Sequence, residues 1–595
     1  MNRSHLVRAF QALLLLAFLL VSIYYIYNYH VWPLSRDQWH MYAPYFEQGL
    51  WRTLLTPMST HRHIFPFFFF DTDMRFFHGL NHWLAACGAF FDALIISLLI
   101  FSLMREPTLG GDEKWALGIF LVTLLSWLIN IAQLGWGFMS TQYYLTILAS
   151  LLSVYCLYQY RSEGKCYLIG ICVACGVIAT FSFGMGILVW PALFYFAWVW
   201  NVKFKTTFLI STIFVVSLLL FLWLPGGDSI EQSISINWGE TIRFTSQLAA
   251  GPIYYLLKSF RVIDAGSIKE FAIFIGVAAS LCGVILLTRT LIFRPQLSLF
   301  SVFCHTLIML GLGTATLISV TRSQIFLDIW VDRYQIWAVL LWAGLIPLLY
   351  LQTNGLNSIP KKLLLVVLAC FPLLAFPSQL DMGSRLYEYK TRVREALLVY
   401  QVGIADKAAA QEALHWNWEH KLPFFFAVMS HLEKTGKNIY YQGPYHLLGK
   451  PVDLKMLAKL APMDVRVESI IPISSTQLLD QREYAIPRSY VSQSGGLAGK
   501  NVAFEIRGVI TMSNAWKYAI SINEQGIVNG VAIRIQHSML PRPTRNFEYR
   551  DYNFFGVVRD DGSQKIRWCL LTDQDPEQPG WISESWPLVQ ASSRK

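Results

Sequence analysis

The sequence predicts a polytopic α-helical membrane protein with about 11 transmembrane helices and a C-terminal α+β tail that contains a small β-sandwich. Two observations support this fold class. Of the 595 residues, 54% are hydrophobic and only 14% are charged, whereas roughly a quarter of the residues in a soluble domain are charged. Long apolar runs also recur as far as residue 378 and are absent from the tail. The sequence therefore divides into a transmembrane domain, 1–378, and a tail.

The apolar runs fix the expected helices one by one, since a helix needs about 20 apolar residues to cross a bilayer. The first run is too long for the apolar core of a signal peptide and is not followed by a cleavage site, so we expect an uncleaved helix. The predicted helices lie near 9–30, 79–103, 115–132, 143–160, 167–181, 184–200, 207–224, 270–289, 297–319, 333–351 and 363–378.

Pairs of basic residues predict the orientation. Each pair falls on the same side of the predicted bundle as Arg3 and Arg8, and the positive-inside rule assigns that side to the cytoplasm. An odd number of helices then places the tail outside. The pairs are Arg105 and Lys114, Arg161 and Lys165, Lys203 and Lys205, Arg289 and Arg294, and Lys361 and Lys362. Because many basic residues lie in these short loops, the net charge of +10 does not indicate a nucleic-acid partner.

The tail is predicted to have two parts. Residues 379–461 form a helical linker region with mixed charges, and residues 462–595 form the β-rich, sandwich-like domain. The second part contains five alternating runs, NVAFEIRGVI, KYAISIN, GVAIRIQ, NFFGVVR and KIRWCLL. Of the nine cysteines only Cys569 lies in the tail, so no disulfide framework is expected there.

The first candidate site lies in the stretch Ser35–Phe67, just after the first helix. Asp37 stands at the predicted membrane edge beside Trp39 and His40, which are candidate acceptor or sugar contacts. A carboxylate in that position suits a general base. The alternative is a solvated or helix-capping aspartate.

Cationic groups on the predicted outer side form the second candidate site. The positive-inside rule makes outward arginines uncommon, and a guanidinium binds phosphate through a bidentate fork. Pairing with Asp71, Asp73, Asp328 or Asp332, or with lipid headgroups, is the alternative. The candidate phosphate-binding residues are His61, Arg62, Arg322, Arg333 and Tyr334, with Asp332 and Gln142 as further sugar contacts.

Glycine-rich segments predict further outward turns. In TFSFGMGILVWP, Gly184 and Gly186 allow a tight turn or a close approach of helices. In QLGWGFMSTQYYL, Gln133 and Gln142 lie at another turn, where an amide can hydrogen-bond a sugar.

This layout resembles the GT-C superfamily of membrane glycosyltransferases, bacterial members in particular. The resemblance rests on Asp37 in SRDQWHMY, His61-Arg62 in THRHIFP, the SFGMGILVWP segment and Arg333-Tyr334 in VDRYQIWAVLLW. It covers about residues 1–420. It implies a multi-pass protein of the bacterial inner membrane, with a cytoplasmic N-terminus and a periplasmic C-terminal domain, that acts in glycan biosynthesis of the cell envelope.

The resemblance implies an inverting transfer from a polyprenyl-phosphate-linked sugar to a glycan, lipid or protein acceptor. Asp37 is expected to act as base, and the Arg and His groups to stabilise the leaving phosphate. Many relatives carry two adjacent acidic residues where this chain has Asp37-Gln38. A divalent metal is therefore not favoured, although Asp71 and Asp73 leave that alternative open, and no other cofactor is expected.

Two other functions remain open at this stage. A polysaccharide polymerase or ligase also joins lipid-linked glycans outside the membrane. A transporter or flippase usually carries ionisable groups inside the membrane, and Asp92 is one such group in the second predicted helix. The tail is expected either to bind carbohydrate through Trp516, Tyr549, Tyr552 and Trp568 or to act as a structural cap.

Overall fold

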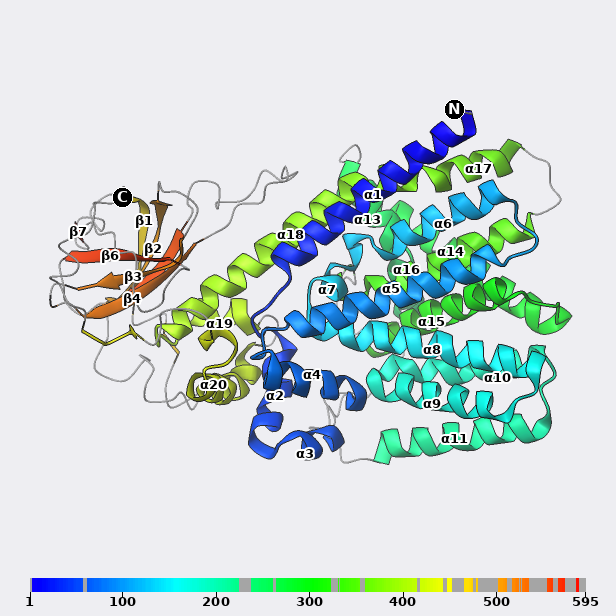
Figure 1. Ribbon diagram of the computed structural model, residues 1–595, viewed down its shortest axis with the longest axis horizontal. Helices are drawn as coiled ribbons and strands as arrows, with labels where there is room; N and C mark the ends of the chain where they lie inside the picture. The colour runs from blue at the N-terminus through cyan, green and yellow to red at the C-terminus, as the bar shows by residue number, and fades with distance from the viewer. Residues whose placement is uncertain are drawn as a thin grey trace. The chain divides into compact units, whose positions relative to one another are not determined.

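The computed structural model comprises two compact units (Figure 1). The first consists of Met1–His30, Leu50–Asp73 and Asn81–Leu386, and the second of Val31–Gly49, Met74–Leu80 and Tyr387–Lys595. The structure describes residues 3–56, 61–223, 237–260, 264–322, 330, 332–353, 359–414, 418–441, 447–451, 465–474, 478–479, 501–510, 516–523, 525, 527–534, 554–559, 565–572 and 585–587.

Long helices make up most of the first unit. A helix of the structure lies near each of the eleven predicted transmembrane helices. They are α1 (Arg3–Tyr29), α5 (His82–Met104), α6 (Gly111–Leu125), α8 (Gly137–Glu163), α9 (Cys166–Ser182), α10 (Val189–Val199), α11 (Phe204–Trp223), α14 (Ala265–Phe293), α15 (Leu299–Arg322), α16 (Gln335–Gln352) and α17 (Ile359–Ala369), which is followed by α18 (Phe371–Gln401).

Seven of the described helices are long and apolar enough to cross a membrane, or eight if the bent pair α17–α18 counts as one span. The other three predicted spans exist as helices, but they do not meet the criteria for a membrane span. Helices α9 and α10 are shorter than 18 residues, and α8 is long enough but is not sufficiently apolar. Most of α8 is buried inside the unit. Its hydroxyl side chains bond to nearby backbone carbonyls, as Thr146 does to Gln142 at 2.8 Å. A helix that faces other helices can therefore carry polar groups that a lipid-facing helix cannot.

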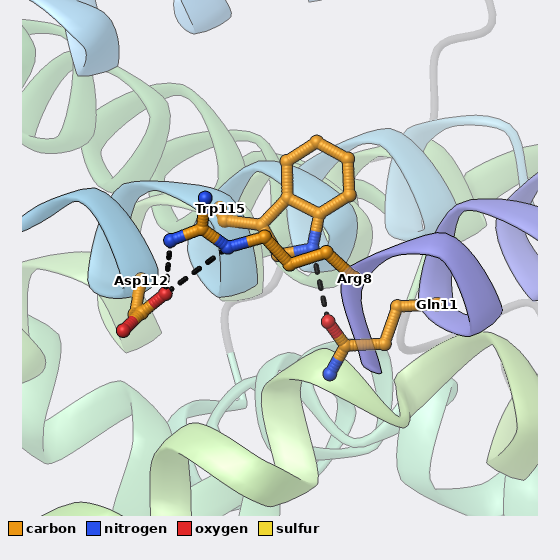
Figure 2. A network of polar contacts seen from close by, with 4 residues as sticks. All are labelled: Arg8, Gln11, Asp112 and Trp115. Carbon is orange, nitrogen blue, oxygen red and sulfur yellow. Dashed lines mark hydrogen bonds and ion pairs between the residues drawn. The ribbon is translucent and has the colours of Figure 1, made fainter. Parts of the chain in front are cut away.

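The predicted basic loops gather at one end of the first unit. Figure 2 shows how α1 and α6 meet there: Arg8 pairs with Asp112 through Nε at 3.2 Å, and Trp115 donates to Gln11 at 2.9 Å. Since Asp112 is exposed, this pair adds little stability. Four other contacts join the remaining loops at this end, namely Lys361 with Glu113, Arg289 with Gln352, Arg294 with Trp198 and Arg161 with Trp200.

Short helices occupy several of the segments between the predicted spans. In the first unit these helices are α3 (Leu50–Leu55), α4 (Ile64–Phe76), η1 (Leu128–Asn130), α7 (Ile131–Leu134), η2 (Gly184–Leu188), α12 (Trp238–Ala249), α13 (Gly251–Phe260) and η3 (Asp332–Tyr334). The sequence did not predict α3, α4 or α12. These helices are too short to produce a membrane-length apolar run.

Helices of the second unit pack around the charged half of α18. They are α2 (Asp37–Gln48), α19 (Lys407–Leu414), α20 (Trp418–Thr435) and η4 (Asn438–Tyr440). Their packing is aromatic: the Phe425 ring of α20 lies 4.6 Å from both the Trp39 and the Tyr400 rings. A hydrogen bond joins η4 to the segment before α5, because the backbone N–H of Asn438 donates to the carbonyl of His78 at 2.7 Å.

One seven-stranded antiparallel sheet forms the β-rich part of the second unit, in the order β1-β2-β5-β4-β3-β6-β7. The predicted sandwich of two sheets is therefore corrected to a single sheet for the described strands. An alternating pattern predicts a strand with a buried face, but it does not say what covers that face. The strands are β1 (Val465–Ser474), β2 (Asn501–Ile510), β3 (Trp516–Ile522), β4 (Val528–Arg534), β5 (Phe554–Arg559), β6 (Lys565–Thr572) and β7 (Ser585–Pro587).

Candidate functional site

Asp37 is the first residue of α2, in the second unit. Its Oδ1 accepts a hydrogen bond from the ammonium of Lys421, on α20, at 2.8 Å. The Asp37 side chain is 53% exposed and that of Lys421 only 16%. The carboxylate of Asp37 is therefore accessible and has a cationic partner.

Arg36, just before Asp37, has a strained backbone. Its φ of 54° is rare for a residue with a side chain, and such strain collects at functional positions. The backbone N–H of Arg36 donates to the carbonyl of Ala413 at 3.2 Å, and its guanidinium carbon lies 4.4 Å from the centre of the Tyr389 ring. Two tertiary contacts therefore hold Arg36 in place. No sequence pattern signalled this residue.

The two aromatic neighbours of Asp37 have packing partners. Trp39 is fully buried against Phe425, and the His40 ring lies 4.5 Å from that of Phe424. The buried position of Trp39 argues against the predicted contact with a sugar. His40 is only partly buried and keeps the predicted role open.

Four predicted segments of the first unit meet at one aromatic cluster. The Phe183 ring, between α9 and η2, lies 4.4 Å from the His61 ring and 4.4 Å from the Tyr143 ring of α8. Trp337 of α16 stacks 6.2 Å from Phe183. His63 donates from Nδ1 to the carbonyl of Ser182 at 3.0 Å, which fixes the histidine segment to the end of α9.

Close backbone contacts at two glycines fix the positions of the helices that carry this cluster. Gly186 is required at its position, because a Cβ atom there would lie 1.9 Å from the carbonyl oxygen of Ala179. Similarly, a Cβ atom on Gly137 would lie 2.5 Å from the backbone nitrogen of Ala85. The predicted close approach of helices is therefore confirmed at Gly186, and Gly137 brings α8 against α5.

Three buried polar atoms in the segments that form this cluster have no hydrogen-bond partner among the described residues. They are Oε1 of Gln133, Nε2 of Gln142 and the indole Nε1 of Trp337, and all three side chains are at most 3% exposed. The other polar atom of the Gln133 amide donates to the carbonyl of Arg333. Unpaired buried donors and acceptors are costly and call for a water molecule or a ligand.

The predicted phosphate-binding residues are placed differently from one another. Arg62 is buried, and its Nε and Nη1 each donate at 3.2 Å to the backbone carbonyls of Phe221 and Leu55. Arg62 therefore braces the backbone, and this placement argues against a phosphate role. The guanidinium of Arg333 lies 4.9 Å from the ring of the nearly buried Tyr334. Arg322 is the last residue of α15 and is partly exposed.

The remaining predicted residues are acidic residues near the helices and aromatic residues of the tail. Asp332 begins η3. Asp328 lies outside the described residues, as do Tyr549 and Tyr552 of the tail. Trp516 and Trp568 lie on β3 and β6. Asp71 is partly buried in α4. Within the described part of the chain, no group of three or more His, Cys, Asp or Glu side chains is arranged to hold a metal ion.

Asp73 has a structural role that sequence reasoning did not identify. Its fully buried carboxylate accepts hydrogen bonds from the backbone N–H of Asn81, at 3.1 Å, and of Trp83. Both donors lie at the N-terminal end of α5, where backbone N–H groups lack helical partners. Burial raises the pKa of Asp73 to about 7, against the smaller opposing effect of the two N–H donors.

No family model matches the chain, and no curated protein matches it either. The candidate site is therefore interpreted from the chemistry of its own side chains. Two groups stand out: the exposed carboxylate of Asp37 in the second unit, and the aromatic cluster with its unpaired polar atoms in the first.

Proposed function

We propose that the protein is an inverting membrane glycosyltransferase that moves a sugar from a polyprenyl-phosphate donor to an acceptor outside the cytoplasm. One observation carries the proposal: the segments that bring the Phe183 and Trp337 rings together also carry unpaired buried groups, the amide Nε2 of Gln142 and the indole Nε1 of Trp337. A sugar ring needs both kinds of group, because its C–H faces pack on aromatic rings and its hydroxyls require hydrogen-bond partners. An apolar substrate would leave the polar atoms unpaired.

The proposed reaction is a direct displacement. Asp37 takes the proton of the acceptor hydroxyl, the acceptor oxygen bonds to the anomeric carbon, and the bond from that carbon to the phosphate oxygen breaks. The leaving group is the polyprenyl phosphate with its bonding electron pair. Lys421 donates to Oδ1 of Asp37 and so orients the carboxylate. The charge that grows on the leaving phosphate requires stabilisation by a cationic group.

The test is an assay of the purified full-length protein with a panel of short-chain polyprenyl-phosphate sugars and a membrane extract as acceptor source. Released polyprenyl phosphate is measured by mass spectrometry. We expect one donor to give release that requires the extract, and Gln142→Leu and Trp337→Phe to weaken donor binding. Absence of release from every donor, with the protein folded, would overturn the proposal. Release of a polyprenyl diphosphate from lipid-linked chains would favour the polymerase or ligase alternative.

The orientation also belongs to the proposal. The gathered basic loops support a cytoplasmic location for that end of the first unit. Reporter fusions after Lys165, Lys205 and Lys362 should read cytoplasmic, and a fusion after Lys595 should read periplasmic. A cytoplasmic C-terminus would exclude an outer acceptor for Asp37.

A specific observation supports a transporter as the second candidate. Asp92 lies within the apolar span α5 and is buried, and its Oδ1 has no hydrogen-bond partner among the described residues. The hydroxyl of Tyr144, on α8, is likewise buried without a partner, and the two groups are close enough to interact electrostatically. Ionisable residues inside a membrane often mark a transport path. Transport of a labelled lipid-linked sugar across proteoliposomes tests this candidate.

A further inference from the structure

Asn438 begins η4 in the second unit, just after α20, and its side chain is completely buried. Its amide is bonded to the segment that leads into α2. Oδ1 accepts from the backbone N–H of Leu34 at 3.3 Å, and Nδ2 donates to the carbonyl of Trp32 at 3.4 Å. Nδ2 also donates to the carbonyl of Gly79. One buried side chain therefore joins two loops of the second unit.

Asparagine suits this position in two ways. The φ of Asn438 is 50°, in the left-handed region, which asparagine adopts more readily than most residues with a side chain. A side-chain amide also supplies both an acceptor and donors, and the structure uses both kinds of group. Aspartate keeps only the acceptor, and glycine suits the backbone but supplies neither. No sequence pattern signalled this residue.

Further hydrogen bonds fix the backbone between this amide and Asp37. Residues 30–36 are all described and form neither a helix nor a strand, so these bonds define their path. The N–H of Ser35 donates to Oε1 of Gln38 at 3.2 Å. The N–H of Arg36 follows and donates to the carbonyl of Ala413 at 3.2 Å. Each of the three backbone N–H groups before Asp37 therefore has a defined acceptor.

We propose that Asn438 is a positioning residue for the transfer reaction, because it fixes the backbone segment that sets the place of the Asp37 carboxylate. The inference rests on the proposed function, in which Asp37 takes the proton of the acceptor hydroxyl. Leu34 is only three residues before Asp37, so a displacement of Leu34 moves the start of α2. A displacement of about 1 Å at a reacting group lowers a rate by about 100-fold.

A purely structural role is the alternative, and Asn523 offers a matched control. Asn523 is also buried in the second unit, and its Oδ1 accepts from the backbone N–H groups of Gln525 at 3.0 Å and Ile527 at 2.8 Å. These bonds stabilise the turn between β3 and β4 and not the segment before Asp37. Replacing either asparagine removes buried hydrogen bonds to the backbone, so both replacements should lower the unfolding temperature.

The test is turnover by the purified full-length protein with the panel of short-chain polyprenyl-phosphate sugars and a membrane extract. Asn438→Gly suits the left-handed backbone but removes the amide, and it should lower kcat by about 10- to 100-fold. The Kd of decaprenyl phosphate, measured by calorimetry, should stay within about twofold of wild type. Asn523→Gly should keep kcat within about twofold. Asn438→Asp, which loses the donors, should also lower kcat, and it replaces Asn438→Gly if that variant does not fold.

Hydrogen exchange gives a second readout that does not require turnover. Mass spectrometry of peptides that cover residues 31–40 measures how fast their backbone amides exchange. In Asn438→Gly the amides of residues 34–36 should exchange at least about tenfold faster than in wild type, because an acceptor and the bonds that hold the segment are lost. In Asn523→Gly they should exchange within about twofold of the wild-type rate.

The outcomes separate this inference from the proposed function. Normal kcat in Asn438→Gly, or an equal loss of kcat in the two glycine variants, would overturn the positioning role and leave the glycosyltransferase proposal standing. Unchanged exchange at residues 34–36 would also overturn the positioning role, because the segment would then not depend on Asn438. Absence of transfer by the wild-type protein from every donor would overturn the glycosyltransferase proposal, and the positioning role with it.

Discussion

Arg36 and Arg62 come from one stretch of the chain, yet their surroundings are opposite. Arg62 belongs to the first unit, is 4% exposed and donates to two backbone carbonyls. Arg36 belongs to the second unit, is partly exposed and lies over an aromatic ring beside an accessible carboxylate. An arginine bonded to backbone carbonyls stabilises the fold, whereas Arg36 adjoins an exposed carboxylate in the chain.

This difference shows that the charge of a side chain alone does not identify a binding site. Both arginines lie in the stretch Ser35–Phe67, but only Arg62 was predicted to bind phosphate. Only the tertiary partners separate a structural arginine from one able to bind a ligand. The comparison predicts that variants near Arg36 alter binding or catalysis and that variants at Arg62 alter stability.

The largest expected effect is at Asp37. Asp37→Asn keeps the size of the side chain but cannot accept a proton at neutral pH, so the transfer rate should fall by about two to four orders of magnitude. Initial rates with the best donor measure this, and donor binding should stay unchanged. Glu47→Gln, near the exposed end of the same helix, is the control and should retain the wild-type rate. A near-normal rate for Asp37→Asn would show that Asp37 is only a loop residue.

A smaller effect, on stability, is expected at Asp73. Since burial raises the pKa of Asp73 to about 7, the folded protein binds more protons than the unfolded chain between about pH 4 and pH 7. The free energy of unfolding should therefore fall by up to a few kcal/mol as pH rises through that window, and then level off. Asp73→Asn should flatten this part of the profile. Thermal unfolding across pH measures both proteins, and unchanged pH dependence in the variant would contradict the assignment.

Arg62→Met should destabilise the first unit by about 1–3 kcal/mol, because two backbone carbonyls lose the donor that the buried Arg62 supplies. Arg36→Met, the paired variant, should cost less stability because Arg36 is only partly buried. Denaturation in detergent compares the two variants. A larger loss of unfolding free energy for Arg36→Met than for Arg62→Met would contradict the assignment of the structural role to Arg62.

The smallest expected effect is at Asp92. If sugar transfer is the activity, Asp92→Asn should leave the transfer rate within about twofold of wild type, since the substitution is nearly isosteric and lies outside the proposed site. Loss of an observed lipid-transport activity in the same variant would instead favour the transporter.

The sequence predicted the helices well because apolar runs of membrane length are a strong and local signal. It found the segments around His61, Phe183 and Trp337, since charged groups and glycines interrupt those runs. It missed α2 and α4, whose short lengths and mixed composition leave no such signal. The sequence also could not predict that the strands form a single sheet, because strand alternation does not show which strands pair.

The site residues show where such reasoning stops. Asp37 was found as a carboxylate just after an apolar helix, but its partner Lys421 lies 384 positions away in the chain. Arg36 carries no local signal, because its left-handed backbone conformation is imposed by tertiary contacts. Conversely, Arg62 matched the expected pattern and proved to be bonded to carbonyls. Long-range packing decides these roles, and composition does not encode it.

The stereochemistry of transfer tests the central claim, a direct displacement assisted by Asp37, most directly. A β-linked polyprenyl-phosphate sugar is supplied to the full-length protein with its acceptor, and the anomeric configuration of the new bond is read by NMR from its proton coupling. The account predicts an α-linked product, because attack from the face opposite the phosphate inverts the anomeric carbon. A β-linked product would require a second displacement through a covalent intermediate, and it would contradict the role given to Asp37.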